Sequence, residues 1–250
     1  MSQLLTIFGG SGFVGRYITR RMAKLGWRVK VAVRKPNDAL FVKTYGVVGQ
    51  VEPIFCNVRD DTSVNSTLKG ADVVINCVGI LSETGKNRFN SVQLQGAKRV
   101  AQMASAEGVK RFVQISAIGV DENAKSSYSR SKAFGEKAVL KYFPEAVILR
   151  PSVIFGPEDQ FFNRFAGMAR NSPILPLIGS DTNFQPVYVD DVAKAAELAA
   201  ILAISGSGDT EGVRSSGYDD VEVVDVHSCG EAPSISCATK ADALTQSQTL

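Results

Sequence analysis

The sequence has little of what several large classes of protein require. Its 250 residues include a single histidine, His227, and the formal net charge is only +3. No apolar run approaches the roughly 20 residues that a membrane-spanning helix needs, and a charge this small gives no reason to expect binding to nucleic acid or a membrane surface. Because His227 lies far along the chain in a Ser/Gly/Thr-rich stretch, a Ser/His/Asp triad within the folded body is not expected.

Cysteine is also scarce, and its spacing excludes two further classes. The four cysteines, which contain no C-x-x-C pair, are Cys56, Cys77, Cys229 and Cys237. Their spacings indicate no disulfide framework. A site built on His227 and the two cysteines near it would offer three soft ligands, whereas closed zinc sites usually have four. We therefore expect no metal site.

The remaining composition is that of an ordinary globular protein. Hydrophobic residues make up 44% of the chain and charged residues 21%, and the length suits one large domain with a small appendage. Residues 1–8 run straight into a glycine-rich loop, so we expect no signal or transit peptide. These features suggest a cytoplasmic protein of bacterial type and leave open a peripheral attachment to the inner membrane through a partner.

Apolar runs alternate with stretches of helical periodicity from the N-terminus to Arg150. Strands are predicted over Leu4–Phe8, Arg28–Val33, Val51–Phe55, Asp72–Val78, Arg111–Ser116 and Ala146–Arg150. Helices are predicted over 14–25, Ser91–Glu107 and Tyr128–Tyr142. This alternation is typical of the α/β class with a Rossmann-type, doubly wound parallel sheet, whose strand order begins 3-2-1-4. Two strands would then separate Cys56 from Cys77 and prevent a disulfide between them.

The alternation weakens beyond Arg150, which divides the chain into three parts. Residues 1–150 are the expected dinucleotide-binding domain, and 151–204 a small, reduced portion of a substrate domain. That portion should hold a helix over Phe161–Arg170, then a short strand and a helix within Pro186–Ala203 that has Asp190 or Asp191 as its N-cap. Residues 205–250 are rich in Ser, Gly and Thr, and we expect disorder there apart from one strand at Val221–Val226.

A glycine-rich loop joins the first strand to the first helix. Gly9, Gly12 and Gly15 form G-x-x-G-x-x-G in "TIFGGSGFVGRY". Such a loop lets backbone N–H groups approach a pyrophosphate, and the helix dipole adds to the attraction. The other loop positions that we count as cofactor contacts are Ser11, Phe13 and Val14. The alternative is a tight glycine turn that holds no ligand, but the strand before the loop and the helix after it favour the nucleotide.

The residue after the second strand indicates which nucleotide is bound. Sites for NAD usually place Asp or Glu there to bind the ribose 2′-hydroxyl, whereas this chain has Arg34 followed by Lys35. A guanidinium group can bind a 2′-phosphate with two hydrogen bonds, and a carboxylate would repel it. The sequence therefore favours NADP(H) over NAD(H); the alternative is an exposed basic turn.

Two residues with catalytic potential lie one helical turn apart. In "YSRSK", Tyr128 and Lys132 are at i and i+4 and share a helix face. A nearby ammonium group would lower the pKa of the tyrosine and suit it to acid–base work on a carbonyl. Ser116, at the carboxyl end of the fifth strand, could bind the same substrate oxygen. Alternatively, the pair is an exposed tyrosine and a solvated lysine.

These motifs occur in an order that resembles a known superfamily. "GGSGFVG", "NCVG", "ISAIG", "YSRSK", "LRPSVIFGPED" and "PVYVDDVAKA" are similar to the short-chain dehydrogenase/reductase superfamily, in its extended or atypical branch, from about Leu4 to Ala203. The segment from "YSRSKAFGEKAV" to "FQPVYVDDVAKA" resembles one subgroup: the Rossmann-fold accessory subunit of respiratory complex I (NADH:ubiquinone oxidoreductase) and its bacterial relatives.

The resemblance implies roles for individual residues. Gly9, Gly12 and Gly15 would hold the pyrophosphate, and Arg34 the 2′-phosphate. Tyr128 would match the proton donor, with Lys132 assisting it and binding the ribose. Asn57 and Val58 are implied to lie near the adenine. Cys77, Val78 and Gly79 would lie beside the nicotinamide ribose. The nicotinamide itself would be flanked by residues from Pro151 to Val153.

Two departures from the superfamily bear on function. Only residues 117–127 separate Ser116 from Tyr128, a shorter segment than active extended members usually have, and the sequence after Ala203 does not match the family's substrate domain. They favour a protein that holds NADPH tightly as an accessory or assembly factor of complex I, or in quinone metabolism. The alternatives are an active NAD(P)-dependent oxidoreductase or epimerase/dehydratase on a small carbonyl or sugar-nucleotide, and a scaffold that binds no nucleotide.

Overall fold

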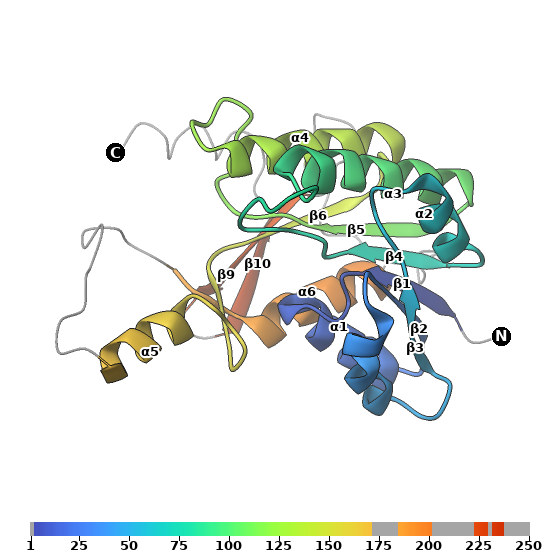
Figure 1. Ribbon diagram of the computed structural model, residues 1–250, viewed down its shortest axis with the longest axis horizontal. Coiled ribbons are helices and arrows are strands. Elements are labelled where there is room, and N and C mark those ends of the chain that lie inside the picture. Colours follow the sequence, from blue (N-terminus) through green and yellow to red (C-terminus); the bar gives the residue numbers. More distant parts are fainter. Residues whose placement is uncertain (1–2, 172–184, 202–222, 230–231, 238–250) are drawn as a thin grey trace.

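A parallel sheet forms the centre of the protein (Figure 1). The structure is a computed structural model, and it describes residues 3–171, 185–201, 223–229 and 232–237. The first six strands of the sheet are β1 (Leu4–Phe8), β2 (Arg28–Val33), β3 (Val51–Phe55), β4 (Val73–Asn76), β5 (Arg111–Ile115) and β6 (Val147–Pro151). They lie side by side in the order β3-β2-β1-β4-β5-β6, and every pair is parallel. The predicted Rossmann-type, doubly wound sheet is confirmed.

Two further strands extend the sheet beyond β6. β9 (Val223–Cys229) pairs in parallel with β6, and β10 (Ala232–Cys237) pairs antiparallel with β9. The first includes part of the predicted strand at Val221–Val226, but β10 occupies a segment for which the sequence predicted disorder. Ladder hydrogen bonds to a neighbouring strand compensate there for a composition poor in large apolar residues. The rest of the disorder prediction, over 205–222, 230–231 and 238–250, lies outside the described residues.

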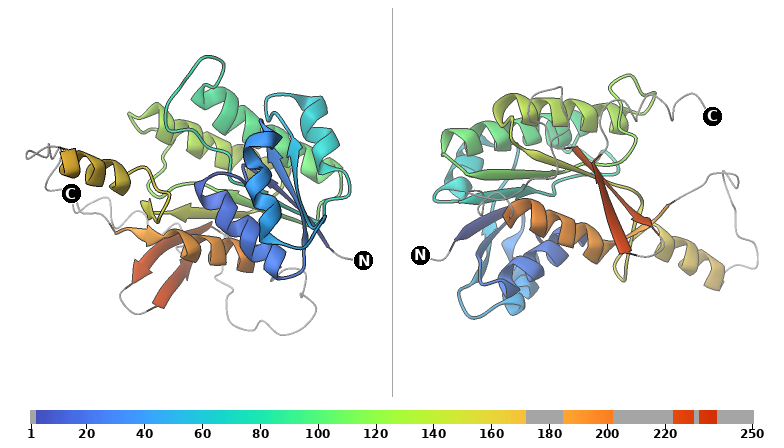
Figure 2. Two further views of the ribbon diagram at one scale, coloured as in Figure 1. Left: turned by 60° about the horizontal axis from the view of Figure 1, so that its bottom comes forward. Right: turned by 180° about the vertical axis from the view of Figure 1, so that it is seen from behind.

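Helices cover both faces of the sheet (Figures 1 and 2). One face carries α1 (Phe13–Lys24), the 3₁₀ helix η1 (Pro36–Tyr45) and α6 (Val189–Ile201). The other face carries α2 (Asp61–Leu68), a π-helical turn η2 (Asn90–Leu94) that leads into α3 (Gln95–Ala106), and α4 (Ser127–Tyr142). Because strand side chains alternate, Leu5 and Ile7 pack on the α1 side while Phe8 packs on the α3 side.

The segments after β6 form a small separate unit. β7 (Ile154–Phe155) pairs in parallel with β8 (Val187–Tyr188), and α5 (Phe162–Asn171) lies between them in sequence. α6 begins at Val189, so the prediction that Asp190 or Asp191 is its N-cap is wrong: both lie inside the first turn. Carboxylates are favourable there because they face the positive end of the helix dipole.

Among the helices of the described residues, none is both long enough and apolar enough to cross a bilayer.

Candidate dinucleotide-binding site

The loop between β1 and α1 turns so tightly that it depends on glycine. Gly9 has φ = 75°, and its carbonyl oxygen accepts a hydrogen bond from the Gly12 N–H at 3.0 Å. A Cβ atom on Gly15 would lie 2.3 Å from that same oxygen. Side chains at Gly9 and Gly15 would therefore strain or block the turn.

The first turn of α1 offers backbone N–H groups to a ligand. No side chain caps α1, whereas α2 is capped by Asp60 and α4 by Ser126. The N–H groups of the first helical turn, at Phe13, Val14 and Gly15, have no acceptor within the helix. They belong to the turn that follows the carboxyl end of β1, where doubly wound sheets bind nucleotides. This uncapped turn and the glycine cradle fit a pyrophosphate.

Arg16 crosses the same loop from the next position of α1. Its guanidinium group donates to the carbonyl oxygens of Ser11 and Gly12, both at 3.3 Å, and stacks 5.1 Å from the centre of the Phe41 ring. Arg16 also lies 3.7 Å from Glu158, a residue of the segment after β7. The sequence pattern did not single out Arg16, although its position directly after the last glycine was a usable signal.

Arg34 follows the last residue of β2, and its side chain is exposed. The neighbouring Lys35 forms an ion pair with Asp38 at 3.7 Å. The position is the one that sequence reasoning assigned to the 2′-phosphate, and the basic side chain there is open to solvent.

The two residues implied near the adenine lie just after β3, beyond Cys56. The Asn57 side-chain oxygen accepts from the backbone N–H of Arg59 at 3.2 Å, and the Val58 carbonyl oxygen accepts from Arg99 at 2.8 Å. These bonds fix the backbone of the loop after β3. The roles of Asn57 and Val58 toward adenine stay predictions.

The segment after β4 places its backbone beside a buried lysine. Cys77 donates its N–H to the Phe8 carbonyl oxygen at 2.9 Å, and Val78 donates to the side-chain oxygen of Asn76 at 3.1 Å. A Cβ atom at Gly79 would lie 3.4 Å from the Lys132 Nζ. Burial raises the pKa of the Cys77 thiol to about 12, which makes it a small packing residue rather than a nucleophile.

Lys132 lies almost completely inside the protein, with 8% of its surface exposed. Its ammonium group donates to the carbonyl oxygen of Ile115, the last residue of β5, at 3.2 Å. Burial lowers its pKa to about 8, even though the nearby Glu136 carboxylate favours the charged form. α4 therefore delivers one partly charged ammonium group between the ends of β4 and β5.

Tyr128 is not activated in the way that the sequence suggested. Burial raises the pKa of its hydroxyl, so the predicted lowering by Lys132 is wrong for this arrangement. The cause is burial of the hydroxyl, and the Lys132 ammonium group is bonded to the Ile115 carbonyl oxygen. The Tyr128 ring packs edge-on against Phe89, with 5.9 Å between ring centres.

Ser116 carries a hydroxyl group without a partner in the described part of the chain. It directly follows β5 and is 6% exposed, and its backbone N–H donates to Leu149 at 2.7 Å. Its Oγ atom is buried and makes no hydrogen bond to any described residue. A buried unpaired hydroxyl is costly, which fits a group kept for a ligand.

Gln93, which the sequence analysis did not identify, connects the loop after β4 to α4. Its side-chain nitrogen donates to the Ile80 carbonyl oxygen at 2.6 Å, and its side-chain oxygen accepts from the Ser131 hydroxyl at 2.7 Å. It thereby ties the loop that contains Gly79 to the residue beside Lys132. The sequence offered one sign of this role, which is that Gln93 is a polar residue on the buried face of a predicted helix.

The residues expected beside the nicotinamide lie at the end of β6 and just beyond it. The Pro151 carbonyl oxygen accepts from the Ile118 N–H at 3.0 Å, and the Val153 carbonyl oxygen accepts from Val187 at 3.0 Å. β6 itself is fixed to α4 by a two-pronged bond from Arg150 to Glu136, at 3.1 and 2.5 Å.

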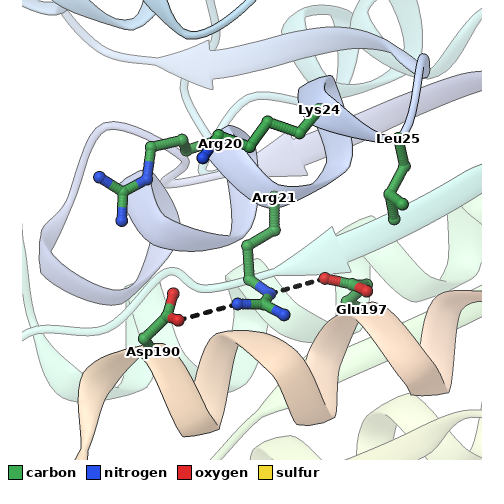
Figure 3. A pocket seen from close by; sticks show the side chains of 6 residues that line it. All are labelled: Arg20, Arg21, Lys24, Leu25, Asp190 and Glu197. Atoms are coloured by element: carbon green, nitrogen blue, oxygen red, sulfur yellow. Dashed lines mark hydrogen bonds and ion pairs between the residues drawn. The ribbon is translucent and has the colours of Figure 1, made fainter.

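A separate cavity of about 230 Å³ lies between α1 and α6 (Figure 3). Arg21 points into it from α1 and pairs with Asp190 at 2.8 Å and with Glu197 at 2.6 Å on α6. Through these two ion pairs, the Arg21 guanidinium group holds α1 and α6 together. We therefore treat this cavity as structural.

The described residues contain no group of three or more His, Cys, Asp or Glu that could hold a metal ion. The side chains of His227, Cys229 and Cys237 lie outside the described part of the chain. Cys56 and Cys77 are both free thiols, as the strand order required.

Comparison with known proteins agrees with this geometry. Residues 5–206 match the family described as "NAD dependent epimerase/dehydratase family". The chain belongs to this epimerase/dehydratase family. Within it, the chain is 38% identical over 205 residues to subunit 9 of the NADH dehydrogenase (ubiquinone) 1 alpha subcomplex of Arabidopsis thaliana, which covers 81% of this chain and 50% of that protein. The predicted resemblance to the complex I accessory subunit is confirmed, and the chain spans about half the length of this relative.

Two other proteins are also similar to this chain. The ceramide reductase of Caulobacter vibrioides is 30% identical over 221 residues, which cover 88% of this chain and 68% of that protein. Among solved structures, MoeE5 in complex with UDP-glucose and NAD has a TM-score of 0.70 at 17% identity, covering 99% of this chain and 82% of that one. The last similarity supports the fold alone.

Proposed function

We propose that this epimerase/dehydratase family member binds NADP(H) at the carboxyl edge of its sheet and holds it tightly. In this proposal it serves as an accessory or assembly factor of a complex I-type NADH:ubiquinone oxidoreductase, or in quinone metabolism. The observation that carries the proposal is the contrast between Lys132 and Tyr128. The Lys132 ammonium group is buried at the end of β5, where it would bind a ribose, while burial raises the pKa of the tyrosine that would donate protons.

The residues divide into those that bind and those that could react. The uncapped turn of α1 would hold the pyrophosphate, Arg34 would bind the 2′-phosphate, and Lys132 would bind the nicotinamide ribose. When bound, the nucleotide would supply a hydride. Burial raises the pKa of the Tyr128 hydroxyl and so makes it a weaker proton donor, and this favours holding the nucleotide over using it.

The accessory role is supported by the relatives. The Arabidopsis protein at 38% identity is named as a subunit of an NADH dehydrogenase that acts on ubiquinone. Peripheral attachment to a membrane-bound complex would follow from such a partnership.

A second candidate function is an active NAD(P)-dependent oxidoreductase or epimerase/dehydratase. The buried Ser116 hydroxyl without a described partner favours it, because such a group could bind a substrate oxygen. The similarity to a ceramide reductase, which the chain covers over 68% of its length, points the same way.

Turnover separates the two functions. Purified protein is given NADPH and panels of quinones and carbonyl compounds, and loss of reduced nicotinamide absorbance is followed. We expect at most one equivalent of NADPH to be oxidised per chain. Many equivalents oxidised with any acceptor would contradict a holding role and establish an active oxidoreductase.

A further inference from the structure

Four aromatic side chains are gathered on the surface of the small unit that follows β6. Phe155, Phe161, Phe162 and Tyr188, here called the aromatic patch, are each 38% to 41% exposed. Their rings contact one another, with centres 5.1 Å apart for Phe161 and Phe162, and 5.5 Å apart for Phe155 and Tyr188. Isolated exposed hydrophobic residues are normal, but a contiguous group of large rings marks an interaction surface.

The patch borders a cavity that is mostly apolar. Its volume is about 470 Å³, and three of its lining residues, Phe155, Phe162 and Tyr188, belong to the aromatic patch. The surface therefore offers both projecting rings and a recess between them.

α5, an amphipathic and basic helix, contributes Phe162 to the patch and begins directly after Phe161. Phe162, Phe165 and Ala169 recur at i, i+3 and i+7 and so share one face. Arg164 and Arg170 fall outside that face and are exposed, and α5 contains no acidic residue. Aromatic side chains on one face with arginines on the other are typical of helices that lie in a membrane interface.

The acidic residues just before α5 are already engaged by the protein. Glu158 accepts a hydrogen bond from the Tyr17 hydroxyl at 2.8 Å. Asp159 is buried, and its carboxylate accepts the backbone N–H groups of Phe162 at 2.7 Å and Gly156 at 3.2 Å. These acids anchor α5, and α5 itself contributes two arginines and no acidic residue.

The position of α5 makes this surface accessible. In both figures the helix lies at the periphery of the molecule, away from the central sheet and the helices that cover it (Figures 1 and 2).

We propose that the aromatic patch and α5 dock on a bilayer surface that contains anionic lipids. The rings would enter the interface between headgroups and acyl chains, and Arg164 and Arg170 would pair with lipid phosphates. Although a net charge of +3 gives no overall attraction, the local charge of this helix does. A second copy is the less favoured occupant, since a symmetric contact would bring the same two arginines together.

The test is co-sedimentation of the full chain with vesicles of phosphatidylcholine alone or with 30% phosphatidylglycerol, a composition of about one anionic lipid in three. We expect binding to the anionic vesicles only. The double variant Arg164→Glu/Arg170→Glu should bind them at least about 30-fold more weakly, because each basic residue near such a surface contributes a factor of about five. Lys43→Glu/Lys69→Glu has the same net charge change at exposed positions of other elements and should bind like the wild type.

A second variant reports whether the rings enter the bilayer. Phe161→Trp should show a blue shift of its fluorescence with anionic vesicles, against a background from the buried Trp27. Equal binding by the two charge-reversal variants, equal binding to both vesicle types, or no binding and no shift would overturn the proposal. Self-association that is abolished by Phe161→Ser, without vesicle binding, would instead assign the surface to a second copy. Since neither readout involves the nucleotide, failure here leaves the NADP(H) proposal untouched.

Discussion

The Lys132 ammonium group donates a hydrogen bond to the carbonyl oxygen of Ile115 at 3.2 Å, deep inside the protein. This bond places a cation at the junction of α4, β5 and the loop after β4. Burial disfavours the charged form and lowers its pKa from 10.5 to about 8. The fold therefore maintains this group at a cost in stability, as expected for a residue kept for binding rather than for packing.

Replacing Lys132 should reveal how much its buried charge destabilises the folded protein, and how this destabilisation depends on pH. Between pH 8 and 10.5 the folded protein has lost the proton that the unfolded chain keeps, so the wild type gains stability as the pH rises through this range. Lys132→Met lacks this titration. We expect the variant to be more stable than the wild type by about 2 kcal/mol at pH 7, after allowance for the lost hydrogen bond. The difference should shrink towards pH 10.

Urea unfolding without nucleotide, at pH 7 and pH 10, measures both values. Lys137→Met on the same helix is the control, because Lys137 is exposed and its change should have little effect at either pH. If the stability difference between Lys132→Met and the wild type is the same at both pH values, burial of the charged Lys132 ammonium group does not destabilise the folded protein.

Arg34→Glu tests the choice of nucleotide. A carboxylate at this exposed position would repel a 2′-phosphate and accept a hydrogen bond from a 2′-hydroxyl. We expect NADPH affinity to fall about 10- to 100-fold and NADH to become the preferred ligand. Lys35→Glu, next to it but already in contact with Asp38, should change the preference far less. Fluorescence titration with both nucleotides decides, and an unchanged ratio of affinities in Arg34→Glu would remove the 2′-phosphate role.

Tyr128→Phe should leave nucleotide binding largely intact. The hydroxyl group is not activated, and the glycine loop and Lys132 supply most of the expected contacts. We expect the dissociation constant for NADPH to change less than about fivefold, which corresponds to a single weak hydrogen bond. Calorimetric titration measures it. Loss of binding in this conservative variant would mean that the tyrosine is a main nucleotide contact.

Gln93→Leu should weaken binding through the loop that it holds. The change removes the bond to the Ile80 carbonyl and leaves the Ser131 hydroxyl only its bond to the Tyr128 carbonyl, at a cost of about 2 kcal/mol in stability. We also expect faster hydrogen exchange at Gly79 and weaker NADPH binding. Thr67→Val removes a buried hydrogen bond in α2, far from this loop, and serves as the control for stability alone. Equal NADPH affinities in the two variants would make Gln93 purely structural.

The elements predicted well from the sequence are those with strong apolar patterns. β1, β4, β5 and β6 are buried on both faces over most of their length, so they read as largely apolar runs. α1, α3 and α4 have apolar residues at helical spacing. The elements that were missed are short or polar. α2 has the sequence DTSVNSTL, with too few apolar residues for a period, and β10 depends on its pairing with β9.

The position of the glycine loop in the candidate site could be predicted from the sequence, but the directions and pKa values of its side chains could not. The glycine loop has a fixed relation to its strand and helix, so Gly9 to Gly15 lie where the pattern required. The direction of the Lys132 side chain depends on a carbonyl group contributed by β5, and sequence spacing carries no information about that contact. For the same reason the pKa of Tyr128 was predicted in the wrong direction, and Gln93 was missed.

The central claim is that the protein keeps NADP(H), and native mass spectrometry of the freshly purified full chain tests it most directly. We predict a species that carries one NADP(H) per chain, which survives buffer exchange and is released as NADP(H) on denaturation. A bare chain that binds neither nucleotide when supplied, or a chain that carries NAD(H) in its place, would contradict the account.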